Sequence, residues 1–363
     1  MKFFMPVRIY SETDCVKHHG AELAALGRRA LIVTGGRSSR ENGSLADVTG
    51  VLSQAGIPFA VFDRIEQNPS VETALAAAKA ALEFGADFVI GVGGGSPMDA
   101  AKAAALLARH PGKGEAFLYD PEPGTDSARL PLALIPTTCG TGSEATPVSV
   151  LTRRSRQTKQ SIRHKVFADL GLVDGKYLAS APARVIRSTA VDALAHLWES
   201  RVNAHADDFS IMCAREGMRL WARSRELLTG TGEISSEDRQ NLMNASTMSG
   251  MAIAQTGTSL PHGLSYPVTV RLGIPHGIAC GVFEAGYLAA ASKEEREECL
   301  HLAGFADLAE WKAYFAVLSD HLILPQDQVL AAADLLARNT AKLANAPFPC
   351  GPETVRKIAL GGE

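Results

Sequence analysis

The stretch FVIGVGGGSPMDAAK, residues 88–102, joins an apolar run to a helical pattern through three consecutive glycines. The β-branched residues before the turn predict a buried strand, and glycine lets the backbone turn tightly and approach a ligand closely. Ser96 is predicted as the N-cap of the following helix, Pro97 as its first residue and Asp99 as the capping-box partner. A helix that starts at the end of a strand presents free N–H groups to an anion. We interpret the turn as a phosphate site; the alternative is a tight turn without a ligand.

The turn departs from the two common nucleotide-binding patterns. Met98 stands where the pattern G-x-G-x-x-G has its third glycine, and no Gly-Lys-Ser/Thr follows as in a P-loop. A second loop, PTTCGTGSEAT (136–146), also follows a strand-like run and is rich in hydroxyl groups. Hydroxyls and bare amides at a second strand end would complete a dinucleotide crevice, although such a loop taken alone is more often only a connection.

Strand-like and helix-like segments alternate through the first half of the chain. We expect strands over residues 30–34, 60–63, 88–92 and 132–136, and a helix from Val71 to Phe84 that closes at Gly85. This order predicts a mostly parallel sheet with helices on both faces. A first strand is expected within residues 1–10, and a surface loop over the Pro/Gly/Asp-rich residues 110–130.

The character of the sequence changes after residues 172–174. Helical periodicity rich in Ala, Leu and Met continues to the C-terminus, and Pro182 suits the first position of a helix. We therefore expect an α/β dinucleotide-binding domain over 1–178 and an all-helical metal-binding domain over 179–363.

Composition bounds the class of protein. The chain has 363 residues, 46% of them hydrophobic, and two domains are the default expectation for that length. A net charge of −3 offers no basic stripe for nucleic acid, and no apolar stretch approaches the length of a membrane span. The six cysteines show no CxxC spacing, so we expect reduced thiols and a cytoplasmic location.

A metal site is the second candidate for chemistry. In STAVDALAHLWES (188–200), Asp192 and His196 are four residues apart on one helical face, where they can bind one ion or hydrogen-bond each other. Pro-His-Gly occurs twice, around His262 and His276. Together these four residues offer one carboxylate and three imidazoles, a complete ligand set for Fe²⁺ or Zn²⁺. Such an ion acts as a Lewis acid on an alcohol or carbonyl oxygen.

The chain resembles the iron-containing (group III) alcohol dehydrogenases over nearly its full length. GGGSPMDAAK, PTTCGTGSEAT, AVDALAH, PHGLSYP and GIPHG occur in the order of that family and at close to its intervals. The resemblance implies a Rossmann-like N-terminal domain followed by an all-α C-terminal domain, the fold shared with dehydroquinate synthase. It also implies an interdomain cleft in which the nicotinamide meets the metal, and a homodimer.

Carried over by position, the resemblance implies roles for individual residues. The implied metal ligands are Asp192, His196, His262 and His276. The implied cofactor-binding residues are Asn68, Gly94, Gly95, Ser96, Asp99, Thr137, Thr138, Thr141, Lys159 and Leu178.

Two features of the chain bear on its cofactor and on its chemistry within this family. Members that prefer NAD often hold an acidic residue after the first strand of the nucleotide-binding domain. Here TGGRSSREN (34–42) has glycines at that point, followed by Arg37 and Arg40, so we expect NADP rather than NAD. Many members also carry a histidine four residues after His262, where this chain has Tyr266. Tyr266 is therefore predicted as a proton relay or as a pocket residue.

The sequence predicts a metal-dependent, NAD(P)-linked alcohol dehydrogenase or aldehyde reductase that uses Fe²⁺ or Zn²⁺ and small-molecule alcohols or aldehydes. One alternative is a glycerol-type polyol dehydrogenase or a dehydroquinate synthase-like lyase on the same scaffold. Another is a non-catalytic nucleotide-binding regulator. No nucleic-acid or membrane partner is expected.

Overall fold

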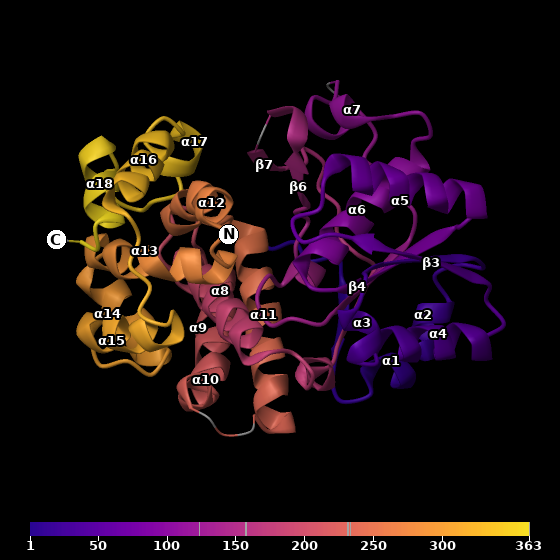
Figure 1. The fold of residues 1–363 in the computed structure, drawn as a ribbon, viewed down its shortest axis with the longest axis horizontal. Helices are drawn as coiled ribbons and strands as arrows, with labels where there is room; N and C mark the ends of the chain where they lie inside the picture. The colour runs from indigo at the N-terminus through magenta and orange to yellow at the C-terminus, as the bar shows by residue number, and fades with distance from the viewer. Residues whose placement is uncertain (123, 157, 231, 233, 363) are drawn as a thin grey trace. The chain divides into compact units, whose positions relative to one another are not determined.

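The structure is a computed structural model that describes residues 1–122, 124–156, 158–230, 232 and 234–362. The chain divides into two compact units. The α/β unit comprises Met5–Thr138 and Gly142–Ala181. The helical unit comprises Met1–Phe4, Cys139–Thr141 and Pro182–Glu363. Each unit keeps its colour range in Figure 1, indigo to magenta for the first and rose to yellow for most of the second.

A six-stranded sheet forms the centre of the α/β unit. All of its strand pairs are parallel, and their order in space is β1-β8-β5-β4-β2-β3. The strands are β1 (Arg8–Ser11), β2 (Ala30–Gly35), β3 (Phe59–Ile65), β4 (Phe88–Gly93), β5 (Leu132–Pro136) and β8 (Leu170–Val173). The parallel α/β architecture is confirmed, and so are the four strands expected between residues 30 and 136. A separate antiparallel pair consists of β6 (Val150–Arg153) and β7 (Thr158–Ser161).

Helices cover both faces of this sheet (Figure 1). Alternate residues of β2 point to opposite faces, so that Leu31 packs in one apolar cluster and Ile32 in the other. The first cluster includes α5 (Val71–Phe84) and α6 (Gly95–Arg109), whose many alanines allow close approach to the strands. The second is covered by α1 (Cys15–His18), α2 (Gly20–Ala24) and α4 (Ser44–Gln54). The short helix α3 (Ser38–Glu41) lies between β2 and α4 in the chain.

Local signals explain α5. The Ser70 hydroxyl accepts a hydrogen bond from the Thr73 N–H at the start, and Gly85 ends the helix in the left-handed conformation at φ 71°. The predicted bounds, Val71 to Phe84, are those observed.

The second half of the α/β unit also contains three short 3₁₀ turns, η1 (Ser143–Ala145), η2 (Arg154–Arg156) and η3 (Gly175–Leu178).

Three expectations were wrong in detail. The loop over 110–130 contains a short helix, α7 (Glu115–Tyr119), because Phe117, Leu118 and Tyr119 are buried. The first strand begins only at Arg8. Pro182 is the N-cap of the next helix rather than its first residue, since its ψ of 142° is extended.

The helical unit is arranged around one buried helix, α8 (Ala183–Arg201). Every residue of α8 from Ala190 to Arg201 is buried, because α9, α11 and α13 pack around it. Among the described residues, none of the helices is both long and apolar enough to cross a membrane. The other helices are α9 (Asp208–Arg223), α10 (Arg225–Thr229), α11 (Ser236–Thr256), α12 (Leu260–Leu272), α13 (His276–Ala290), α14 (Lys293–Leu302), α15 (Leu308–Leu318), α16 (Gln326–Leu336), α17 (Thr340–Leu343) and α18 (Pro352–Ala359).

Candidate functional site

α8 carries three ionisable side chains on one face in the interior of the helical unit. Asp192, His196 and Glu199 occupy positions i, i+4 and i+7, which lie one above the other along a helix. All three are buried. A buried carboxylate or imidazole needs a partner, since burying an unpaired charge costs several kcal/mol. The face therefore has to be complemented by charges from neighbouring helices or by a cation.

The two Pro-His-Gly turns supply the complement by starting two helices. His262 lies in the first turn of α12, and His276 is the first residue of α13. Gly277 permits the close approach of α13 to α8. A Cβ at Gly277 would lie 1.8 Å from the carbonyl oxygen of Ser188 and 2.9 Å from the Asp192 Cβ. Any side chain at position 277 would therefore push His276 away from Asp192.

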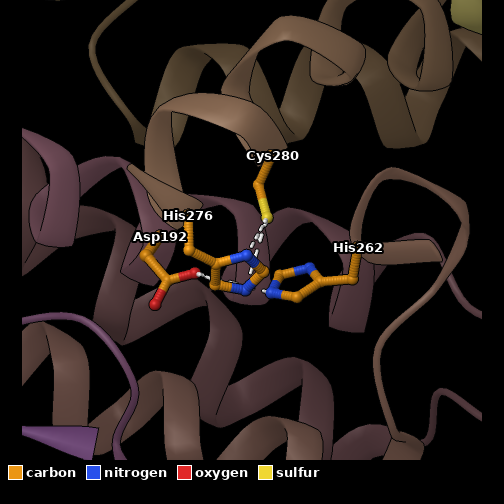
Figure 2. A group of neighbouring side chains, drawn as sticks. All are labelled: Asp192, His262, His276 and Cys280. Atoms are coloured by element: carbon orange, nitrogen blue, oxygen red, sulfur yellow. Dashed lines mark hydrogen bonds and ion pairs between the residues drawn. The ribbon is translucent and has the colours of Figure 1, made fainter. Parts of the chain in front are cut away.

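Four potential ligand atoms meet where these helices converge (Figure 2). They come from Asp192, His262, His276 and Cys280, and all lie within 4.8 Å of one another. Asp192 Oδ1 is 3.5 Å from His262 Nε2 and 3.8 Å from His276 Nε2. Asp192 Oδ1 and His262 Nε2 are both buried and have no hydrogen-bond partner among the described residues.

This arrangement fits a divalent cation. A buried carboxylate oxygen and an imidazole nitrogen face each other without hydrogen-bond partners among the described residues, and a second imidazole lies beside them. Carboxylate and imidazole are the donor set of Fe²⁺ and Zn²⁺ sites. The surroundings also stabilise positive charge. Burial alone would lower the pKa of His262, but Cys280 and Glu199 raise it well above its ordinary value. Burial alone would raise the pKa of Asp192, but the three histidines hold it well below its usual range, so Asp192 is ionised at neutral pH.

His196, the fourth predicted ligand, lies beside this group and is not part of it among the described residues. Its ring stacks on His262 with 4.3 Å between centroids, and its Nδ1 is 3.3 Å from the carbonyl oxygen of Gly140. An Nδ1–H that donates to a carbonyl leaves Nε2 with the lone pair that a metal requires. Burial lowers the pKa of His196 to about 4, although Asp192 opposes the shift, so the ring is neutral at neutral pH.

Glu199 fixes the orientation of His262. Its Oε1 contacts His262 Nδ1 and accepts the His262 backbone N–H at 3.2 Å, while Oε2 accepts the N–H of Ser259. Glu199 is ionised, because His262 lowers its pKa against the effect of burial. Nδ1–H therefore donates to the carboxylate, and Nε2 remains as the metal-binding nitrogen.

Neither Glu199 nor Cys280 is among the residues predicted from sequence, although a signal for both was present. Cys280 follows His276 by four residues and Glu199 follows His196 by three. Residues three or four positions apart lie on the same face of a helix, as Asp192 and His196 do, so this rule would have placed Glu199 beside His196 and Cys280 beside His276. Burial would raise the pKa of Cys280, but His262 and His276 lower it to about 7.

Tyr266 lies against one of the candidate ligands. Its ring is nearly parallel to that of His276, at 7° and 5.7 Å between centroids. Burial raises the pKa of its hydroxyl to about 12. The hydroxyl is therefore protonated at neutral pH and can act as a hydrogen-bond donor rather than as a base.

The predicted phosphate turn begins its helix earlier than expected. α6 starts at Gly95 with Gly94 as N-cap, so the predictions of Ser96 as N-cap and Pro97 as first residue were wrong. The Ser96 hydroxyl instead accepts the backbone N–H of Asn68 at 3.1 Å. No side chain of the described residues caps this helix. A Cβ at Gly94 would come within 3.0 Å of the Thr138 hydroxyl, so glycine lets the turn and the second loop approach closely.

Asp99 does not form the predicted capping box. Its Oδ1 accepts the Ser143 hydroxyl at 2.7 Å, and its Oδ2 accepts the Val150 N–H at 2.8 Å. Burial raises the pKa of Asp99, although Lys102 partly offsets the shift. The Asp99 carboxylate therefore ties α6 to the second loop at Ser143 and to the segment after that loop at Val150. These partners take the side chain away from the start of its own helix.

The structure brings several of the other predicted cofactor residues together. Lys159 Nζ donates to Asn68 Oδ1 at 2.6 Å, so Asn68 links Lys159 to the Ser96 hydroxyl. Asn68 adopts the left-handed conformation at φ 59°. The Thr137 N–H donates to the carbonyl of Gly93 at 2.9 Å, which joins the two loops. Of the remaining positions, Thr141 belongs to the short segment that groups with the helical unit, and Leu178 is buried at the end of η3.

Two family models match the chain. The model described as iron-containing alcohol dehydrogenase covers residues 6–175, and the C-terminal model of the same family covers residues 186–310. Together they include the turn at the start of α6 and all four predicted metal ligands.

Individual relatives agree with this match. The chain is 35% identical over 258 residues to long-chain-alcohol dehydrogenase 1 of Geobacillus thermodenitrificans, which covers 70% of this chain and 65% of the relative. It is 29% identical over 312 residues to an NADPH-dependent butanol dehydrogenase of Clostridium saccharobutylicum, covering 85% and 79% respectively. The crystal structure of an iron-containing alcohol dehydrogenase from Thermotoga maritima has a TM-score of 0.89 at 34% identity and covers 99% of both chains.

These matches confirm the resemblance carried by the five motifs, and with it the fold class. They support the expectation of an oxidoreductase that acts on a CH–OH group with a divalent metal ion and a nicotinamide cofactor. The chain belongs to the iron-containing alcohol dehydrogenase family.

Proposed function

We propose that the protein interconverts small alcohols with aldehydes or ketones by metal-dependent, NAD(P)-linked hydride transfer. The observation that carries this proposal is the buried meeting of Asp192, His262 and His276, in which two ligand atoms lack hydrogen-bond partners among the described residues. A purely structural cluster would satisfy these atoms internally, since unsatisfied buried polar groups are costly. The family match supplies the reaction class.

In this proposal Asp192, His196, His262 and His276 hold Fe²⁺ or Zn²⁺. When bound, the ion polarises the substrate oxygen as a Lewis acid, and the nicotinamide exchanges a hydride with the substrate carbon. Glu199 keeps the Nε2 atom of His262 available through its contact with Nδ1.

The cofactor is assigned to the α/β domain over 1–178, and the ion to the helical domain over 179–363. Backbone N–H groups of Gly94, Gly95 and Ser96 at the uncapped start of α6 suit a pyrophosphate. Asp99 positions this turn, while Asn68, Thr137, Thr138, Thr141, Lys159 and Leu178 complete the cofactor set. We infer a preference for NADP, because Arg37 and Arg40 follow β2 without an acidic residue between them and the strand.

Tyr266 is assigned to the substrate pocket. Stacking on His276 places its ring against a metal ligand, and its high pKa keeps the hydroxyl protonated. A hydroxyl in that state can donate a hydrogen bond to a substrate oxygen. We further infer a homodimer in the cytoplasm. The cytoplasmic location is supported by the six free cysteines, all of which lie in the described residues.

Metal-reconstitution kinetics test the proposal. The protein is stripped with a chelator, reloaded with Fe²⁺ under anaerobic conditions or with Zn²⁺, and assayed with NADPH or NADH and a series of aldehydes, ketones and glycerol. We expect NADPH consumption that depends on the ion. His276→Ala should abolish metal retention and activity, whereas His301→Ala, on the exposed surface of α14, should retain both.

Each rival gives a different outcome. Oxidation of glycerol in preference to simple alcohols would favour a polyol dehydrogenase. Nucleotide binding without turnover, under any ion and with any carbonyl, would contradict the dehydrogenase and favour a regulator.

A further inference from the structure

We propose that the sulfur of Cys280 is a ligand of the ion in the helical unit, so that the site holds a thiolate in addition to carboxylate and imidazole donors. This inference rests on the proposed function for the presence of the ion. Cys280 lies outside the five family motifs and is not among the metal ligands predicted from the sequence.

Helix α13 presents Cys280 to the same point as His276. The two residues are four positions apart on one helix, so their side chains lie one above the other. Cys280 Sγ lies 3.8 Å from His276 Nε2, and its distances to the ligand atoms of Asp192 and His262 are within 4.8 Å. Figure 2 shows the sulfur and the imidazole of His276 directed toward each other.

These distances suit a shared ion. Two ligand atoms that each lie ~2.0–2.3 Å from one ion are about 2.8–4.0 Å apart at the angles of about 90–120° that separate neighbouring ligands in four- and five-coordinate sites. The measured pairs, 3.5 Å for Asp192 to His262 and 3.8 Å for Cys280 to His276, are close to that separation. Only a small inward movement of each side chain is required.

A second observation points to a ligand at this place. Asp192 Oδ1 and His262 Nε2 are buried, face the same point and lack hydrogen-bond partners among the described residues. The Cys280 side chain is completely buried, and its contacts with His276 are long even for sulfur. By contrast, Cys139 lies 3.2 Å from the Thr189 hydroxyl and is already hydrogen-bonded.

The binding step conserves charge and oxidation state. The S–H bond breaks, a sulfur–metal bond forms, and the proton is released to solvent, so neither sulfur nor metal is oxidised or reduced. Thiolate is a soft ligand that favours Zn²⁺ over Fe²⁺. The site should therefore discriminate more strongly in favour of zinc than one built from carboxylate and imidazole alone.

Cobalt(II) spectroscopy tests the proposal directly. The stripped wild-type protein, loaded with one equivalent of Co²⁺, should show a sulfur-to-cobalt charge-transfer band in the near ultraviolet. Cys280→Ser should lose the band while Cys213→Ser, a matched change of a buried cysteine in α9, should keep it. A wild-type protein that binds Co²⁺ stoichiometrically without the band would overturn the proposal, whether or not the variants fold.

Metal competition gives a second measure. We expect Cys280→Ser to lose more Zn²⁺ affinity than the ~10- to 100-fold that loss of an outer hydrogen-bond partner costs, with a smaller loss for Fe²⁺. Equal losses of affinity for Zn²⁺ and Fe²⁺ in Cys280→Ser would contradict the expected preference of the thiolate for zinc. The cobalt band does not require turnover, so a protein that shows the band but oxidises neither NADPH nor NADH would refute the proposed function and leave this inference standing.

Discussion

The Nδ1 atom of His262 is in hydrogen-bond contact with the carboxylate of Glu199, although 63 residues separate them in the chain. Glu199 also accepts the backbone N–H groups of Ser259 and His262, so one buried carboxylate fixes the first turn of α12 and the ring it carries. Because Nδ1 is committed, Nε2 is the nitrogen that faces Asp192. Glu284 is also buried near this carboxylate. Burial and the charge of Glu199 raise the pKa of Glu284 well above its ordinary value, so Glu284 is protonated and does not compete with Glu199 as a negative charge.

Replacing Glu199 should weaken metal binding. Glu199→Ala is expected to lower Zn²⁺ affinity by about 10- to 100-fold, because His262 loses the partner that sets its tautomer. Glu199→Gln keeps an acceptor oxygen and should lose less. Competition with a chromogenic chelator measures the affinity, and Glu294→Ala, on the exposed face of α14, serves as the control. Unchanged metal release from a folded Glu199→Ala protein would contradict this role.

Tyr266→Phe separates the two roles that the sequence leaves open. Phenylalanine preserves the stacking on His276 and removes only the hydroxyl. If the ring shapes the pocket, as we expect, kcat should change by only a few fold and metal content should stay the same, whereas Tyr266→Ala should lose both activity and metal. A fall in kcat of about 100-fold or more in Tyr266→Phe, with metal retained, would instead identify the hydroxyl as a proton donor.

Gly36→Asp should shift the cofactor preference toward NAD. A Cβ at Gly36 would meet only the carbonyl oxygen of Asp63, at 3.7 Å, so the backbone accepts a side chain there. A carboxylate would repel the 2′-phosphate of NADPH and accept a hydrogen bond from the ribose of NADH. We expect the ratio of kcat/KM for NADH over NADPH to rise at least about tenfold, equivalent to about 1.4 kcal/mol. Gly36→Ala controls for size, and an equal rise in that variant would exclude the charge as the cause.

Lys176 should govern the acid stability of the α/β unit. Its Nζ lies 2.5 Å from Asp14 Oδ1 and 2.8 Å from Asp47 Oδ2. Hydrogen bonds from Lys176 and Lys17 lower the pKa of Asp14 from 3.8 to about 2. A carboxyl with a depressed folded-state pKa contributes stability above its unfolded pKa, and this stability is lost as the pH falls through the folded value.

Lys176→Met should therefore lower the urea midpoint of unfolding at neutral pH. As the pH falls from 3.8 to about 2, the midpoint of this variant should fall less than that of the wild type. Lys293→Met removes a far more exposed lysine, 3.7 Å from Glu297, and should change little. Parallel acid profiles of wild type and Lys176→Met would show that Lys176 does not control this loss.

Particular residues show where sequence patterns succeed and where they fail. Helix α5 was predicted to the residue because Ser70 and Gly85 act on their own neighbours along the chain. The cap of α6 was misplaced because the Ser96 hydroxyl binds the N–H of Asn68, a partner 28 positions away. Capping preferences describe local competition for a hydrogen bond, and they cannot include a donor that only folding brings near.

The sequence by itself determined the alternation of strands and helices, the glycine turn after β4 and the family, because periodicity, turn chemistry and motif order are properties of consecutive residues. It also proposed Asp192, His262 and His276 for one site. Only the tertiary structure brought Cys280 and Glu199 to that site and set His196 beside it. The reason is physical: the packing of α8, α12 and α13, permitted by the missing side chain at Gly277, decides which atoms from distant segments meet in one small buried volume.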